Sequence, residues 1–209
     1  MVGKHTKTYS LSSLLCSKKN LKKRAEEINL IGRAELTSVP PVTALLHDAE
    51  VTVSQDLIVP TDRGKFGHKE FADVGAALQF FAEIGFVHGD INRRNVRLTQ
   101  SGFSILDFEP CLKQLNHGRV KTMATIPYIA NTDKLQNHIS ILTDKLGFFY
   151  FVKRVLGTFS PRDIIELSKS NDHSRYLGFN EKDLIDVSYT ELLSLAEIKD
   201  IAADKKFYT

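Results

Sequence analysis

The chain has 209 residues, of which 42% are hydrophobic and 25% are charged, as is typical of a globular protein with an apolar core. No apolar run reaches the roughly 18 to 20 residues that cross a bilayer, and no apolar signal core follows the first lysines, so we expect a cytoplasmic protein without a membrane span. The formal net charge is +3, and the lysine-rich stretch near position 20 has no interleaved aromatic side chains, which argues against a single-stranded nucleic-acid partner. The two cysteines, Cys16 and Cys111, are isolated from each other and indicate neither a zinc site nor a disulfide framework.

The first third of the chain predicts a strand, a helix and two more strands. Residues 1–9 are typical of a short edge strand that carries Lys4 inward, and residues 19–36 carry apolar side chains at helical spacing. The lysines of this helix favour a solvated face, and the alternative is a patch that docks nucleic acid, an anionic glycolipid or an acidic protein partner. Pro40 and its neighbours stop that helix. Two strands then follow at residues 42–47 and 51–59, with a polar turn between them.

A buried helix and a loop occupy the middle of the chain. Large apolar side chains recur at helical spacing over residues 70–84, and Gly85 is a natural residue at the C-terminus of that helix. The chain then enters a loop that begins at His88. Beyond the loop, residues 96–106 have the pattern of a strand, a turn and a second strand, which predicts a hairpin.

Three polar residues flank this hairpin at a spacing that suits phosphoryl transfer. Asp90 and Asn95 are five residues apart in the loop, and Asp107 follows twelve residues after Asn95, where the hairpin would return it to the side of Asn95. The reaction needs Mg²⁺ on hard oxygen ligands and a carboxylate that accepts or orients the proton of the attacking hydroxyl. Asn95 and Asp107 can supply the ligands, and Asp90 can supply the carboxylate.

These residues resemble the motifs of a known superfamily. Segments 88–95 and 107–109, with the sequences HGDINRRN and DFE, resemble the catalytic loop and the metal-binding motif of the protein-kinase-like superfamily. Gly89, where large protein kinases usually carry Arg, is similar to the small atypical kinases: the RIO type, the tRNA-modification-complex kinase and the lipopolysaccharide-core kinases. The resemblance implies an α+β, two-lobed protein-kinase-like fold, with ATP and Mg²⁺ as cofactors.

The resemblance also implies roles for the polar residues. Asp90 would be the catalytic carboxylate, while Asn95 and Asp107 would hold the metal ion. The backbone of the segment between the two lobes would bind adenine, and the residues of that segment are Ile58, Val59 and Pro60.

A lysine and a glutamate are expected to act as a pair at the nucleotide phosphates. By resemblance, Lys4 on the first strand is the lysine that binds them, and Glu27 on the first helix is the glutamate that orients it. Lys7 competes with Lys4 for this role, and Glu26 competes with Glu27.

The second half of the chain resembles the helical lobe of these enzymes. Residues 122–130 are similar to the end of an activation segment that docks a peptide, which favours a protein Ser/Thr hydroxyl as the acceptor. Asp144, before an apolar helix at residues 148–156, resembles the residue that braces the backbone of the catalytic loop. Short helices are predicted within residues 161–209 and would complete this lobe.

The sequence departs from the superfamily pattern in three places. No glycine-rich phosphate loop precedes Lys4, so residues 1–60 would form a truncated β-rich N-lobe and residues 61–209 a helical C-lobe. A partner chain could complete the first lobe by pairing with an open strand edge. Arg97 stands where an apolar residue usually supports adenine, and Glu109 replaces the usual Gly.

We therefore expect an atypical ATP-dependent kinase that transfers the γ-phosphoryl group to a hydroxyl, with a protein Ser/Thr side chain as the acceptor. A sugar kinase, a lipopolysaccharide-core kinase or another small-molecule kinase is the alternative within the same class. A pseudokinase that acts as a binding or regulatory module is the alternative from another class, favoured by the missing glycine-rich loop and by Arg97. The three intact polar positions favour the active enzyme.

Overall fold

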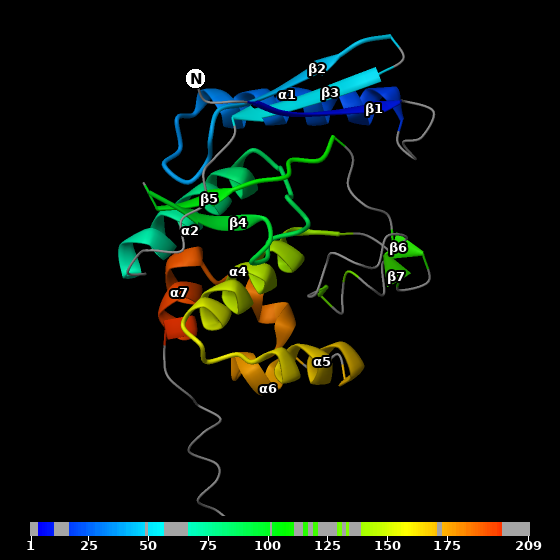
Figure 1. Ribbon diagram of the computed structural model, residues 1–209. Helices are drawn as coiled ribbons and strands as arrows, with labels where there is room; N and C mark the ends of the chain where they lie inside the picture. The colour runs from blue at the N-terminus through cyan, green and yellow to red at the C-terminus, as the bar shows by residue number, and fades with distance from the viewer. Residues whose placement is uncertain are drawn as a thin grey trace, which may run out of the picture. The chain divides into compact units, whose positions relative to one another are not determined.

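The fold is mixed α+β, with small antiparallel sheets and several helices (Figure 1), which confirms the α+β prediction at this level. The computed structural model describes residues 4–10, 17–48, 50–56, 67–100, 102–110, 115–116, 119–120, 129–130, 133, 139–170 and 173–197. The chain divides into two compact units, one of Met1–His88 and Arg94–Lys113, the other of Gly89–Arg93 and Gln114–Thr209. The middle helix and the hairpin belong to the same unit as the amino-terminal sheet. The expected lobes of residues 1–60 and 61–209 stay a prediction.

The first unit is built on an antiparallel sheet with the strand order β1-β3-β2. Its strands are β1 (Lys4–Ser10), β2 (Val42–Leu46) and β3 (Glu50–Asp56). Successive side chains of a strand point to opposite faces, and the buried face of β3 carries Val51 and Val53. In the register of the sheet, Lys7 of β1 lies opposite Val53 and Tyr9 lies opposite Val51. Lys7 and Tyr9 therefore share the buried face, and Lys4 lies on the other face.

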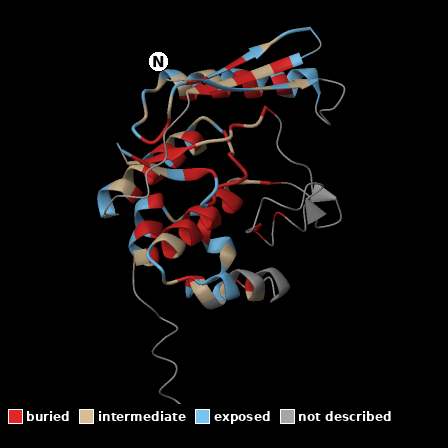
Figure 2. Ribbon diagram, in the orientation of Figure 1, coloured by how far each residue is buried: buried red, intermediate tan, exposed pale blue. Residues whose placement is uncertain are grey.

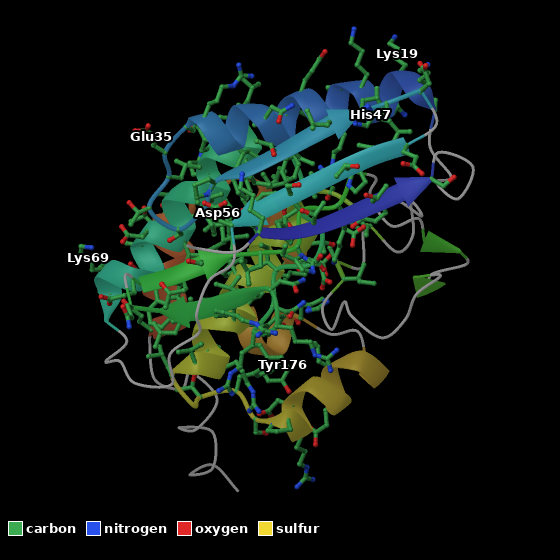
Figure 3. All side chains as sticks on the ribbon, turned by 45° about the horizontal axis from the view of Figure 1, so that its top comes forward. Lys19, Glu35, His47, Asp56, Lys69 and Tyr176 are labelled. Atoms are coloured by element: carbon green, nitrogen blue, oxygen red, sulfur yellow. The ribbon has the colours of Figure 1, made fainter. Side chains whose placement is uncertain are left out.

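Helix α1 (Lys18–Arg33) follows β1 and packs along β2. Ser17 caps its first turn by accepting a hydrogen bond from the backbone of Asn20 at 3.2 Å. Asn29 bonds to both the N–H and the C=O of Ala44 at 2.8 Å, which holds the helix against the strand. A Cβ at Gly32 would lie 1.9 Å from the carbonyl oxygen of Val42, so only glycine permits this approach. The solvated face of α1 is visible in Figure 3, where Lys19 projects away from the sheet.

Helix α2 (His68–Glu83) confirms the buried helix predicted over residues 70–84. Glu70 accepts a hydrogen bond from the N–H of Gly67 at 2.8 Å, and Gly85 ends the helix with a φ of 74°. Its apolar side chains include Phe71, which stacks on Phe103 of the hairpin at a centroid distance of 5.4 Å.

The predicted hairpin is also present in the first unit. Strands β4 (Val96–Thr99) and β5 (Gly102–Ile105) pair antiparallel, with Val96 opposite Ile105. Two buried bonds attach the hairpin to the segments around the larger sheet: Ile105 N–H donates to the Ser38 carbonyl at 2.7 Å, and Gln55 Nε2 donates to the Ile105 carbonyl at 3.0 Å. These bonds explain why the hairpin belongs to the amino-terminal unit.

The second unit contains a short strand pair and the carboxy-terminal helices (Figure 1). Its elements are β6 (Leu115–Asn116), β7 (Arg119–Val120), α4 (Ile141–Val155), α5 (Pro161–Ser170), α6 (Ser174–Leu177), the 3-10 helix η2 (Glu181–Ile185) and α7 (Tyr189–Glu197). Helix α4 is buried along most of its length (Figure 2). It begins well before residue 148, where the helix was expected, because Ser140 caps it by accepting from Leu142 N–H at 3.2 Å.

A buried lysine joins α4 to η2 in this unit. Nζ of Lys145 donates to the carbonyls of Leu184, Ile185 and Val187 at 2.7, 2.8 and 2.8 Å. Burial lowers the pKa of Lys145 from its usual value, although Asp186 and Glu191 oppose this shift. No helix in the described part of the chain is long and apolar enough to cross a membrane.

Candidate functional site

The predicted site residues are distributed over both units. Lys4, Glu27, Asn95 and Asp107 belong to the first unit, and Asp90 belongs to the second. The predicted adenine-binding segment lies outside the described residues, and it consists of Ile58, Val59 and Pro60. Each unit is therefore considered by itself.

The hairpin brings the chain at Asn95 and the chain at Asp107 together. The N–H of Leu106 donates to the Asn95 carbonyl at 2.7 Å, which extends the hairpin by one residue pair beyond Val96 and Ile105. Asn95 is buried, whereas the side chain of Asp107 is 27% exposed. This proximity is the one that the spacing of the two residues predicts.

Asp107 has an unusual backbone conformation. Its φ is 68°, in the left-handed region that non-glycine residues seldom adopt, although Asp tolerates it better than most. The next residue, Phe108, is buried, and its ring lies 5.7 Å from Phe81, 5.9 Å from Phe86 and 5.4 Å from the ring of His88. These contacts hold the residue that follows the strained Asp107.

The lysine that reaches Asp107 is Lys7. Its Nζ donates to the Asp107 carboxylate, and both side chains are partly exposed. Lys4 is exposed at the start of β1, on the opposite face of the sheet. Lys7, which competes with Lys4 in the sequence, is thus the lysine on the side of Asp107, because residues three apart in a strand point to opposite faces. Which of the two lysines binds the nucleotide phosphates stays a prediction.

Glu27 faces the interior of the first unit, whereas Glu26 is exposed. The carboxylate of Glu27 lies 3.4 Å from Nζ of Lys23, one turn earlier on the same helix. The expected pairing of Glu27 with Lys4 is thus replaced by a pair within α1, while Lys7 contacts Asp107.

Sequence reasoning missed two side chains that lie near the segment of Asp107 and Glu109. Burial raises the pKa of Tyr9 far above its usual range, and the carboxylates of Glu109 and Asp107 raise it further. Arg24 of α1 is buried, its guanidinium carbon lies 3.7 Å from the centre of the Phe86 ring, and its Nε donates to the Glu109 carbonyl at 3.0 Å.

A signal for Arg24 exists in the sequence but is weak. Arg24 lies three residues after Leu21 and four before Ile28, on the apolar stripe of α1, yet it also adjoins the run of solvated lysines. Composition alone assigns it to the charged face.

The second unit holds the Asp90 loop through buried hydrogen bonds. The N–H of Gly89 donates to Oδ1 of Asp144 at 2.7 Å, which confirms the predicted bracing by Asp144. Nδ2 of Asn92 donates to the Asp90 carbonyl at 3.1 Å and also to the Asp90 carboxylate. A Cβ at Gly147 of α4 would lie 2.5 Å from the Ile91 carbonyl oxygen, so the helix and the loop are in close backbone contact.

Two other expectations are resolved by the structure. Arg97 is exposed, and its Nε donates to the Arg94 carbonyl at 2.8 Å, so its guanidinium is not buried. Most of the expected docking segment, residues 121–128, lies outside the described residues. Asp133, which sequence reasoning overlooked, accepts from Ser140 N–H at 2.8 Å and from the hydroxyls of Ser140 and Thr143 at 2.6 Å, which fixes the start of α4.

The donor set of the first unit suits Mg²⁺. Asn95 offers a carboxamide oxygen and Asp107 offers a carboxylate. Mg²⁺ commonly takes one or two protein ligands together with water and substrate phosphates. Within the described ranges, no group of three or more His, Cys, Asp or Glu residues forms a self-sufficient metal cage. Asn95 and Asp107 would therefore hold such an ion only together with water or phosphate ligands.

No protein-family model matches the sequence, and no curated protein matches it either. Function must therefore be inferred from the residues themselves.

Proposed function

We propose that the chain is an atypical ATP-dependent phosphotransferase with a two-lobed protein-kinase-like fold, which transfers the γ-phosphoryl group to a hydroxyl. The observation that carries the proposal is the cluster at the open end of the hairpin. Asn95 precedes β4, Asp107 follows the paired strand β5, and Lys7 contacts the Asp107 carboxylate. A lysine, a carboxylate and a carboxamide in this arrangement suit a metal-bound polyphosphate.

The succession of elements supports the same proposal. A strand with an inward lysine, a helix with an inward glutamate, two further strands, a buried helix, a polar loop and a hairpin follow one another in the order that the resemblance implies. A kinase-like fold explains why Asp107 lies directly after the hairpin, and why Asp144 on α4 binds the loop before it.

Asp107 and Asn95 would hold Mg²⁺, and Lys7 would bind the phosphates of ATP. Bound Mg²⁺ would neutralise charge that develops on the phosphates during transfer. Lys7 already contacts the Asp107 carboxylate, and an incoming phosphate would compete for the same ammonium group. The partial exposure of both side chains leaves them accessible to such a ligand.

Asp90 would orient the acceptor hydroxyl and take up its proton. Its carboxylate is buried and accepts a hydrogen bond from Asn92, which fixes the direction of the side chain. General acid–base groups of this kind typically contribute about 10²–10⁴-fold to the rate.

The remaining parts of the proposal come from the sequence. The adenine would lie against the segment of Ile58, Val59 and Pro60, and the acceptor would be a protein Ser/Thr side chain rather than a sugar. A cytoplasmic location also stays a prediction. A partner chain that completes the first lobe would add a strand beside β1, which is an end strand of the described sheet.

One observation favours a second candidate, a pseudokinase that acts as a binding module. Glu27 pairs with Lys23 within α1, whereas an active enzyme of this superfamily is expected to pair its helix glutamate with the strand lysine. A module without phosphoryl transfer has no need of that pairing.

Calorimetric titration with ATP, in Mg²⁺ and then in EDTA, tests the proposed function. The wild-type chain is expected to bind ATP more tightly with Mg²⁺, and Asp107→Asn is expected to lose that gain. Asp56→Asn is the matched control, because Asp56 lies at the end of β3 in the same unit (Figure 3). Mass spectrometry after incubation with Mg·ATP should then find phosphate on the chain or on an added protein. The assignment would be refuted if ATP affinity were the same with Mg²⁺ and in EDTA. It would also be refuted if Mg²⁺ raised the ATP affinity of Asp107→Asn as much as that of the control variant.

A further inference from the structure

Arg24 contacts two residues that lie before and after Asp107 in the sequence, Phe86 and Glu109. Its guanidinium group lies over the ring of Phe86, which precedes the polar loop, at 3.7 Å from the ring centre. Its Nε donates to the carbonyl of Glu109, two residues after Asp107, at 3.0 Å. One side chain from α1 therefore joins two segments that are 23 residues apart in the sequence.

The burial of this arginine needs a reason. Arg24 is only 7% exposed, while the neighbouring Lys22 and Lys23 of the same helix are exposed. A buried charge is unfavourable unless hydrogen bonds and aromatic contacts compensate it, and an apolar residue would fill the same position more simply. The planar guanidinium is suited to this position because it can stack on a ring and donate in its own plane at the same time.

The segment that Arg24 holds contains a strained residue. Asp107 has a φ of 68°, and such a conformation persists only where the surrounding contacts determine it. Phe108 is buried against Phe86, so the ring under the guanidinium also supports the residue after Asp107. The bond to the Glu109 carbonyl fixes the chain one residue farther on.

We propose that Arg24 is a positioning residue for Asp107, which links the placement of helix α1 to the orientation of the carboxylate that would hold the metal. The consequence for metal binding rests on the proposed function. The mechanical part of the proposal, that Arg24 holds residues 105–109 in one conformation, does not depend on the proposed function.

The experiment compares Arg24→Lys with Arg33→Lys in the full chain. Arg33 is an exposed arginine of the same helix, and its Nε also donates to a backbone carbonyl, that of Asn29, at 3.1 Å. The two variants therefore remove the same chemical group, once beside the Asp107 segment and once away from it. Arg24→Gln is the second variant, because it removes the buried charge and folds even where a buried lysine does not.

Native-state hydrogen exchange measures the mechanical part. The N–H groups of Ile105 and Leu106 both donate to backbone carbonyls at 2.7 Å and report on the segment. Arg24→Lys and Arg24→Gln are expected to accelerate their exchange by about tenfold or more, with the amides of α2 unchanged, since local opening follows local contacts. Arg33→Lys should have no effect. Equal exchange in the Arg24 and Arg33 variants would overturn the proposal.

The Mg²⁺ dependence of ATP binding measures the consequence. Loss of a residue that orients a metal ligand typically lowers metal affinity about 10- to 100-fold, so the Arg24 variants should require correspondingly more Mg²⁺ for half-saturation. ATP binding in EDTA should stay unchanged, which a general loss of structure would not allow. If the wild-type chain showed no Mg²⁺-dependent binding at all, the proposed function would fail, and the exchange rates would still decide the role of Arg24.

Discussion

The Asp107 segment and the Asp90 loop hold their carboxylates in different ways. The side chain of Asp107 is 27% exposed, its φ is in the left-handed region, and its charged partner Lys7 is 38% exposed. Asp90 is 6% exposed, it is held by Asn92, and the adjacent backbone is bound to Asp144, which is 2% exposed. Exposed ion pairs contribute little to stability, whereas buried hydrogen bonds are expensive to break. The first arrangement suits a carboxylate that exchanges its partner for a metal ion, and the second suits one whose direction must not change.

The largest effect is expected where the loop is packed most tightly. Gly147→Ala would place a Cβ 2.5 Å from the Ile91 carbonyl oxygen and 2.9 Å from the Ile91 Cβ. Because backbone must move to relieve this contact, we expect a loss of about 1–3 kcal/mol in the free energy of unfolding, together with most of the phosphoryl transfer. Urea unfolding and a transfer assay measure the two effects.

Gly157→Ala is the control for this substitution. Gly157 follows α4 and a Cβ there would meet nothing within 4 Å, so only its φ of 77° opposes alanine, at about 1–2 kcal/mol. Equal loss of transfer in the two variants would mean that the close contact of α4 with the Asp90 loop has no functional role.

The next effect separates the two lysines of β1. Lys7→Met removes the partner of Asp107, and we expect the affinity for Mg·ATP to fall by about 10- to 100-fold, as is usual for a lost charge-assisted contact. Stability should change by no more than about 1 kcal/mol, because the pair is partly exposed. Lys4→Met, on the opposite face of the same strand, should bind Mg·ATP like the wild type. Calorimetry would contradict the site if Lys4→Met were the weaker binder.

The smallest effect concerns the pH dependence of stability. The pKa of Tyr9 is raised in the folded state, whereas the pKa of a tyrosine in the unfolded chain is about 10. Above that pH the unfolded chain loses the phenolic proton and the folded chain keeps it, so stability falls as pH rises. Tyr9→Phe removes this contribution and should lose less stability than the wild type.

Urea unfolding at neutral pH and again above pH 10 measures this difference. We expect stability to fall by no more than about 1.4 kcal/mol per pH unit, which is the limit for one proton that the folded chain keeps and the unfolded chain loses. Tyr189, whose pKa is raised chiefly by burial, is present in both proteins and cancels in the comparison. Parallel stability curves for the two proteins would show that the folded chain does not raise the pKa of Tyr9.

Local patterns in the sequence were sufficient to predict α2 and the hairpin, through apolar spacing ended by Gly85 and through a turn between two apolar runs. The bond from Asp144 to the loop was expected only from the resemblance to the kinase-like superfamily, because an acidic residue near a helix start by itself indicates no more than a helix cap. The choice between Lys4 and Lys7 had no such signal, because β1 carries polar residues on both faces and its inward face is set by pairing with β3.

Two features depend on contacts between distant residues and were not predictable locally. The early start of α4 depends on Ser140 and on Asp133, seven residues before it. The burial of Arg24 depends on Phe86 and Glu109, which the chain brings to α1 only in the folded unit. In a helix rich in lysine, no local pattern separates one buried cation from its solvated neighbours.

The most direct test of phosphoryl transfer is a single-turnover assay of Asp90→Asn with radiolabelled ATP and a general protein acceptor. Asparagine keeps the shape of the side chain but cannot take up the proton of the acceptor hydroxyl. We predict that Mg·ATP binding stays within a factor of about three, while transfer falls by about 10²–10⁴-fold, the range typical of a general base. Equal transfer by the wild type and the variant, or no transfer by either, would contradict the account.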